Sequence, residues 1–254
     1  MMDDSFGVAV VEEEVCFQDP IDFLMRRRAR HLDLLEADCP LATALVSDQT
    51  HGEARGLVDI LPTRFPYVMS LHWVDRTRTA ISDVELRCLA DPSTLGISDD
   101  PLDTVNETRV DNARRALGQC TPSSGAVDVI RHGEDAYMVS WANVILVTES
   151  GGETEYAQLV GIEARLQHLW YRLHLYAKGI EGLVDRLDVV DLGLVRKEIL
   201  RTKLQFAQFC KLDATGSTHL NDLRESLIRT SKLRELYEEF DRSTGLIDEL
   251  EALR

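Results

Sequence analysis

The sequence predicts an α+β protein, with a mixed α/β sheet domain over residues 1–150 and a helical region over residues 151–254. Several short segments before residue 150 alternate apolar and polar residues, which is typical of half-buried strands. Beyond residue 152 the apolar residues recur at alternating steps of three and four, which is typical of long helices that pack along a seam. The run Glu149-Ser150-Gly151-Gly152 separates the two patterns.

The composition indicates a chain that buries a substantial core in a reducing compartment. It has 254 residues, of which 44% are hydrophobic, but no run approaches the roughly 20 apolar residues of a membrane span. The acidic N-terminus lacks the apolar core of a secretory signal. The cysteines form no C-x-x-C pair, which argues against a disulfide framework and a structural zinc site. We therefore expect a cytoplasmic protein.

The net charge of −16 arises from 44 acidic and 28 basic residues. A surface of this kind repels phosphates and so disfavours nucleic acid as a partner. Divalent cations such as Mg²⁺, or basic proteins, suit it better. An acidic protein without any cation site remains the commoner explanation of the same charge.

The first helix is predicted from about residue 20 to residue 37. Asp19 can cap its first amides, and Pro20 fits the first helical position. This helix carries a cluster of arginines that could bind a phosphate-bearing ligand, or equally pair with the acidic surface: Arg26, Arg27, Arg28 and Arg30.

Two strands are predicted next, over residues 67–73 and 84–88, as an antiparallel hairpin. In the first, Tyr67, Met69, Leu71 and Trp73 would share one face. A helix over residues 101–118 follows, and the acidic residues near its start are candidate ligands for a divalent cation: Asp99, Asp103 and Glu107. A helix cap is a sufficient role for the neighbouring Asp100.

The sheet domain is predicted to end with a short strand over residues 126–131 and a long strand over residues 136–148. The latter includes the apolar run 144–147, which indicates burial on both faces. Tyr137 and Trp141 are interpreted as core or sheet-packing residues.

The dominant feature of the helical region is a helix over residues 156–190, beginning near Glu153. Its seam is Leu159, Ile162, Leu166, Leu169, Leu173, Tyr176, Ile180, Leu183, Leu187 and Val190. A second apolar stripe adjoins it, which favours internal three-helix packing over an exposed dimer zipper. Further helices are predicted over residues 192–212 and from residue 218 to the end, the latter interrupted by Gly245.

No phosphate-binding loop, dinucleotide fingerprint, H-E-x-x-H motif or nucleophile elbow is present in the sequence. A catalytic site assembled from distant residues stays open, but no local pattern favours one. The sequence therefore favours a non-catalytic function.

The order of elements resembles the cytosolic portion of the CorA-like divalent-cation channels. The passages 135–141 (DAYMVSW) and 163–170 (EARLQHLW) are similar in character to the last strand and first long helix of that family. The resemblance implies a homo-oligomeric ring at the inner face of a membrane, in which cation or ligand binding acts on long stalk helices. It also implies that the last helix continues past Arg254 into a membrane span. The family's Gly-Met-Asn signature is absent, and no site residue is carried over.

Three functions therefore stand as hypotheses. The first is a cytosolic sensor and oligomerisation domain of the CorA-like kind, and the second is a soluble scaffold that binds a partner through helical surfaces. The third is a metal-dependent enzyme that uses the Asp99, Asp103 and Glu107 cluster.

Overall fold

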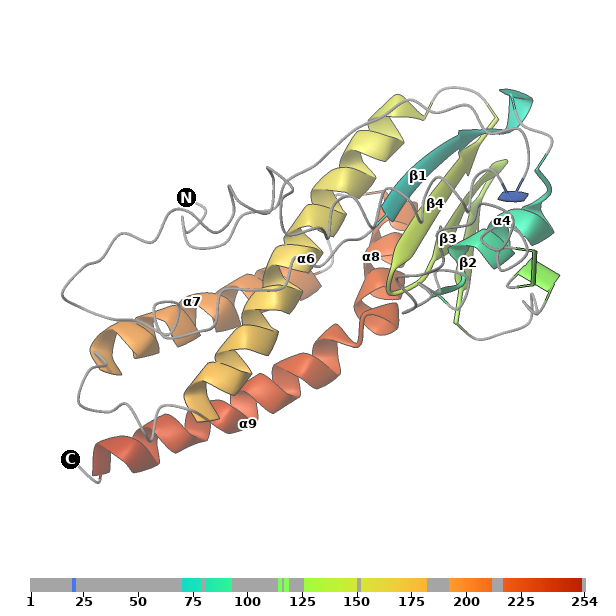
Figure 1. The fold of residues 1–254 in the computed structure, drawn as a ribbon. Coiled ribbons are helices and arrows are strands. Elements are labelled where there is room, and N and C mark those ends of the chain that lie inside the picture. The colour runs from blue at the N-terminus through green and yellow to red at the C-terminus, as the bar shows by residue number, and fades with distance from the viewer. Residues whose placement is uncertain are drawn as a thin grey trace, which may run out of the picture.

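The computed structural model describes residues 20–21, 70–78, 81–92, 114–115, 117–118, 126–149, 152–181, 192–211 and 217–252 (Figure 1). A four-stranded mixed sheet is followed by long helices, so the predicted α+β class is confirmed. In chain order the elements are β1 (Ser70–Asp75), the short 3-10 helix η1 (Arg76–Arg78), α4 (Asp83–Ala90), β2 (Asp128–His132), β3 (Asp135–Val139), β4 (Asn143–Thr148), α6 (Glu153–Glu181), α7 (Leu192–Cys210), α8 (Thr218–Thr230) and α9 (Leu233–Ala252).

The sheet has the strand order β1-β4-β3-β2. Strands β2, β3 and β4 form an antiparallel meander, whereas β1 pairs with β4 in parallel. Gly133, with φ of 61°, makes the turn between β2 and β3. A second turn divides the predicted long strand over residues 136–148 into β3 and β4. In this turn the Ser140 hydroxyl accepts a hydrogen bond from the Asn143 amide at 3.0 Å.

Helices cover both faces of the sheet. Val144 and Leu146 belong to a core shared with α6 and α8, whereas Ile145 and Val147 belong to a second core shared with α4. Figure 1 shows the sheet between α4 on one side and α6 with α8 on the other. The prediction that the apolar run 144–147 is buried on both faces is therefore confirmed.

The predicted second strand of the hairpin is wrong, because residues 83–90 form helix α4. Ser82 begins it with a capping box, in which the Glu85 carboxylate accepts from the Ser82 amide at 2.8 Å. Leu86 and Leu89 are buried, at helical spacing, while Val84 is 57% exposed. Over so short a segment, the alternation of apolar and acidic residues could not distinguish a strand from a helix.

The two tryptophans of the sheet domain lie in different surroundings. Trp141, predicted to be a core or sheet-packing residue, lies in the β3–β4 turn and is 50% exposed. Trp73, on the face of β1 that meets α6, is 38% exposed, stacks on Tyr156 and donates to the Thr148 hydroxyl at 2.9 Å. Tyr137 is buried, as predicted.

Gly152 lies where α6 begins, with φ of 103°, a conformation that favours glycine. A Cβ atom here would lie 2.8 Å from the Thr148 methyl carbon and 3.0 Å from the Trp73 Nε1. We expect Gly152→Ala to destabilise the protein by about 2 kcal/mol, because the left-handed backbone and the close contacts both oppose a side chain.

The matched control is Gly161→Ala, in the exposed middle of α6, where an added Cβ atom meets nothing within 4 Å. This change should stabilise by roughly 0.5–1 kcal/mol, since alanine is the better helix former. Urea denaturation of both variants measures the difference. Equal effects would contradict the role assigned to Gly152.

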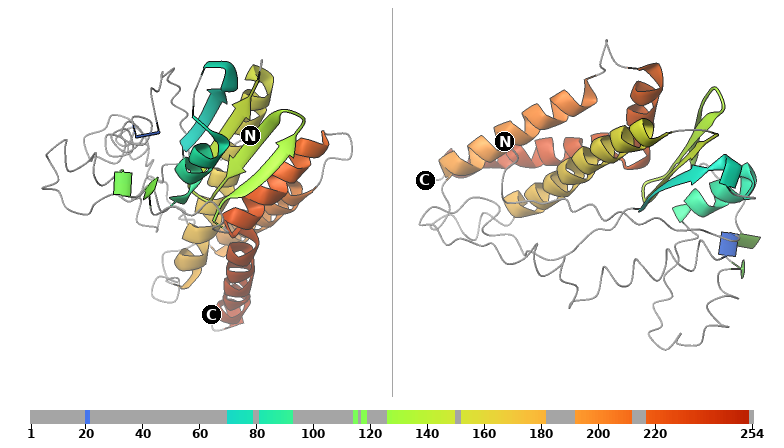
Figure 2. Two further views of the ribbon diagram at one scale, coloured as in Figure 1. Left: turned by 90° about the vertical axis from the view of Figure 1, so that its right-hand side faces the viewer. Right: turned by 90° about the horizontal axis from the view of Figure 1, so that it is seen from above.

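The helices α6, α7 and α9 extend away from the sheet (Figures 1 and 2). The predicted helix from residue 218 onward is wrong in one respect, because Ser231 and Lys232 divide it into α8 and α9. Lys232 has φ of 54°, which ends the α-helical geometry. Helix α9 then continues through Gly245 without interruption. We call the Ser231–Lys232 break the elbow.

Candidate functional site

The predicted ligand-binding arginines and the predicted metal-binding carboxylates both lie outside the described residues. These are Arg26, Arg27, Arg28 and Arg30, and Asp99, Asp103 and Glu107. Of the predicted seam, Leu159, Leu166, Leu169, Leu173, Tyr176 and Ile180 are buried in the core, and Ile162 packs against it. Leu183, Leu187 and Val190 fall in a stretch that the structure does not describe.

The described part of the chain holds no group of three or more His, Cys, Asp or Glu side chains placed to bind a metal ion. None of the helices within the described ranges is both long enough and apolar enough to cross a membrane.

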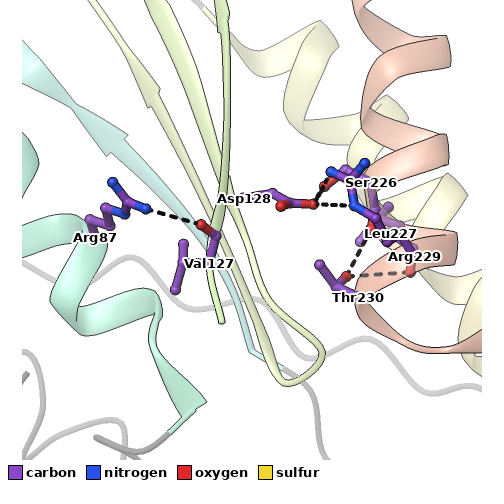
Figure 3. A network of polar contacts seen from close by, with 7 residues as sticks. All are labelled: Arg87, Val127, Asp128, Ser226, Leu227, Arg229 and Thr230. Carbon is purple, nitrogen blue, oxygen red and sulfur yellow. Dashed lines mark hydrogen bonds and ion pairs between the residues drawn. The ribbon is translucent and has the colours of Figure 1, made fainter. Parts of the chain in front are cut away.

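A cluster of polar contacts joins the sheet to α8 (Figure 3). Ser226 donates its hydroxyl hydrogen to Asp128 Oδ2 at 2.7 Å, and Arg229 Nε donates to the same oxygen at 3.2 Å. Arg229 Nη2 forms a further ion pair with this oxygen. Because Ser226 is only 2% exposed, Asp128 is the group that satisfies its hydroxyl.

A group of rings lies at the other end of the same two elements. His132, at the end of β2, stacks on His219, in the first turn of α8, with ring centroids 4.7 Å apart. The start of β2 thus contacts the end of α8, and the end of β2 contacts the start of α8. The two elements therefore run antiparallel along their contact (Figure 2). Burial, together with the charges of Glu155 and Asp135, raises the pKa of the neighbouring Tyr137 to about 12.

Among the described residues, this arrangement holds only some of the parts of a nucleophilic site. Ser217 hydrogen-bonds to Nδ1 of His219, so a serine and a histidine do meet. An activated serine also needs a third group that orients the histidine. The other nitrogen, His219 Nε2, has no hydrogen-bond partner among the residues the structure describes. Within the described residues, the cluster serves as a connection between β2 and α8.

The elbow continues this connection to the distal helices. Trp170 of α6 donates its indole hydrogen to the Ser231 carbonyl at 3.1 Å, which fixes the elbow against α6. Beyond the elbow, Tyr237 of α9 stacks on Phe206 of α7 with centroids 3.8 Å apart. The path from β2 through α8 and the elbow to α9 consists of direct contacts throughout.

Glu163 is a buried carboxyl in the middle of α6, 2% exposed. Gln167 donates to its Oε1 at 2.5 Å, while Oε2 has no hydrogen-bond partner among the described residues. Burial raises the pKa of Glu163 to about 7, although the Gln167 hydrogen bond opposes this shift. A carboxyl in this state titrates near neutral pH.

We expect Asp128→Ala to destabilise the protein by about 1–2 kcal/mol, because the buried Ser226 hydroxyl loses its acceptor. The exposed ion pair of Arg234 and Glu225 provides the control. Arg234→Ala should cost less than about 1 kcal/mol, as exposed pairs do. Thermal denaturation of both variants measures the contrast, and an Asp128→Ala effect no larger than the control would contradict it.

Sequence reasoning did not identify this junction. Asp128 and Arg229 are 101 residues apart, and neither belongs to a motif. Asp128 is the first residue of a strand, and Ser226 lies within an amphipathic helix. Nothing in the sequence around either residue predicts that they are in contact.

No protein-family model, curated protein or solved structure matches this chain.

Proposed function

We propose that the chain is a non-catalytic cytosolic module that senses a cation or small ligand and self-associates, as the cytosolic domain of a CorA-like channel does. Its place would be the cytoplasm, at the inner face of a membrane. The observation that carries the proposal is that one core includes side chains of the sheet and of all the long helices. Val144 of the sheet, Leu166 of α6, Val195 of α7, Leu227 of α8 and Phe240 of α9 belong to it.

A shared core supports signal transmission because close-packed interiors move in discrete steps and do not deform continuously. A shift of the sheet would act on α8 through Asp128 and Ser226. The elbow, held by Trp170, would pass that shift to α9. Helix α7 is tied to α6 by Arg172, a fully buried residue whose Nη1 donates to Gln205 Oε1 at 3.3 Å.

The test uses the full chain with Mg²⁺ as the probe ligand. Sedimentation velocity should reveal a concentration-dependent oligomer, and magnesium should change the amide hydrogen exchange of α9. Calcium and an equal ionic strength of sodium chloride are the controls for a non-specific salt effect. A chain that stays monomeric, with the same exchange rates in all three conditions, would refute the proposal.

A soluble scaffold is the second candidate, and it is favoured by the exposed leucines of α7, Leu200 and Leu204. A scaffold should be a stable monomer or dimer that magnesium does not affect. The third hypothesis, a metal-dependent enzyme, predicts that joint alanine substitution of Asp99, Asp103 and Glu107 abolishes any activity found. An unchanged rate would reject that site.

A further inference from the structure

Helix α7 has an apolar stripe on its outer side, in addition to the one it buries. Val195 and Ile199 face the core, and Phe206 packs against it. On the outer side, Leu200 and Leu204 lie one turn apart and are 67% and 59% exposed. Single exposed leucines are ordinary, but two on one face of a helix form a continuous apolar strip.

The outer strip of α7 is bordered by positive charge. Five exposed residues make up what we call α7's outer face: Arg196, Lys197, Leu200, Arg201 and Leu204. A partner for this face should therefore offer carboxylates beside an apolar residue.

Helix α9 offers such a surface. A shallow hollow on α9 is lined by the residues that we call α9's outer face: Glu235, Glu238, Glu239, Arg242, Ser243 and Leu246. Leu246 is 39% exposed, and the three glutamates are exposed around the same hollow. The surface is therefore acidic and has an apolar residue at one end.

These two outer faces cannot meet within one copy of the chain. The inner sides of α7 and α9 already contact each other, through the Phe206–Tyr237 stack and the ion pair of Lys203 with Asp241. Leu204 and Leu246 lie on the sides of their helices opposite to Phe206 and Tyr237, as the helical spacing requires, whereas Leu200 lies between the two sides of α7, one turn from Lys203. A contact between the outer faces therefore needs two copies.

We propose that α7's outer face on one copy binds α9's outer face on a second copy. This inference rests on the proposed self-association and names the surfaces that produce it. Because the two surfaces differ, the contact is heterologous, and repetition gives a closed ring or an open chain of copies. A contact between two α7 faces would instead bring like charges together, which is unfavourable.

The first experiment replaces both leucines by glutamate in the full chain, as Leu200→Glu with Leu204→Glu. The added charges would face the glutamates of α9, so the dissociation constant measured by sedimentation should rise at least about tenfold. Val84→Glu is the control, since Val84 is also exposed but lies on α4. Circular dichroism checks that each variant is folded. Unchanged association of the leucine variant would overturn the proposal.

The second experiment tests whether the contact is heterologous. A variant of α9, Glu235→Lys with Glu239→Lys, should also fail to associate with itself. A mixture of the α7 variant with the α9 variant retains one intact face on each copy, so the two variants should associate with each other although neither associates with itself. A symmetric α7–α7 contact predicts that the α9 variant still dimerises, which would overturn the proposal.

The outcomes separate this inference from the proposed sensing function. Association that depends on both faces but does not respond to magnesium would refute the sensing and retain the surfaces. Association that responds to magnesium but survives both variants would refute the surfaces and retain the sensing. A wild-type chain that is monomeric at every concentration would refute both.

Discussion

Glu163→Gln should stabilise the protein at pH 8 by about 3 kcal/mol and should change its stability little at pH 4. Glutamine has nearly the shape of the protonated acid and can still accept the hydrogen bond from Gln167. It cannot become charged, so it avoids the cost of a buried carboxylate. The magnitude follows from a pKa raised from 4.5 to about 7, at 1.36 kcal/mol for each unit.

The direction of the pH dependence follows from proton uptake on folding. Below pH 4.5 the Glu163 carboxyl is protonated in the folded and the unfolded chain, so it imposes no penalty. As pH rises towards 7 the unfolded chain releases the proton more readily than the folded one, and the free energy of unfolding falls. Above about pH 7 both states are ionised, and the penalty is constant.

Urea denaturation across this pH range measures the effect as the difference between variant and wild type. Glu134→Gln, in the exposed β2–β3 turn, removes the same charge without altering a buried site. A Glu163→Gln benefit that is equal at pH 4 and pH 8 would show that the carboxyl does not titrate within this window.

Phe240→Ala should cost about 3–5 kcal/mol, which is the usual range for truncating a buried phenylalanine. Phe240 is 0% exposed on α9, and its ring lies 6.5 Å from Tyr176 of α6 and 6.2 Å from Tyr237, between centroids. These neighbours belong to close-packed helices, so we expect the cavity to collapse only in part.

The same substitution tests the coupling of α9 to α6. Hydrogen exchange of α9 should accelerate more than that of β4, because α9 loses its central anchor while the sheet keeps both of its cores. Val84→Ala removes an exposed side chain from α4 and should cost less than about 0.5 kcal/mol. A Phe240→Ala effect below about 1 kcal/mol would contradict the packing described.

The parts of the fold that the sequence predicted are those in which burial repeats along the chain. The spacing of Leu159, Leu166 and Leu173 reports directly which side of α6 is buried. The apolar run 144–147 likewise reports that β4 is covered on two faces. Such patterns follow from local geometry, so they predicted the α+β class without any tertiary information.

The errors fall where distant contacts decide the local structure. Residues 83–90 form a helix because Leu86 and Leu89 pack into the core beneath the sheet, which local alternation does not reveal. The elbow depends on Trp170, which lies 61 residues before Ser231. The Asp128 junction likewise depends on a distant contact, because Arg229 follows Asp128 by 101 residues. The proposed ligand residues before position 110 remain predictions.

The parallel pairing of β1 with β4 has a consequence for the order of folding. Strands β2, β3 and β4 are joined by short turns and can pair early, because their contacts close only small loops. The contact of Ser70 with Asn143 instead joins residues 73 apart in the sequence, and that of Arg229 with Asp128 joins residues 101 apart. Contacts of such separation form slowly. During synthesis the meander emerges before α8. Strand β2 therefore stays uncovered until α8 has been synthesised and packs against it.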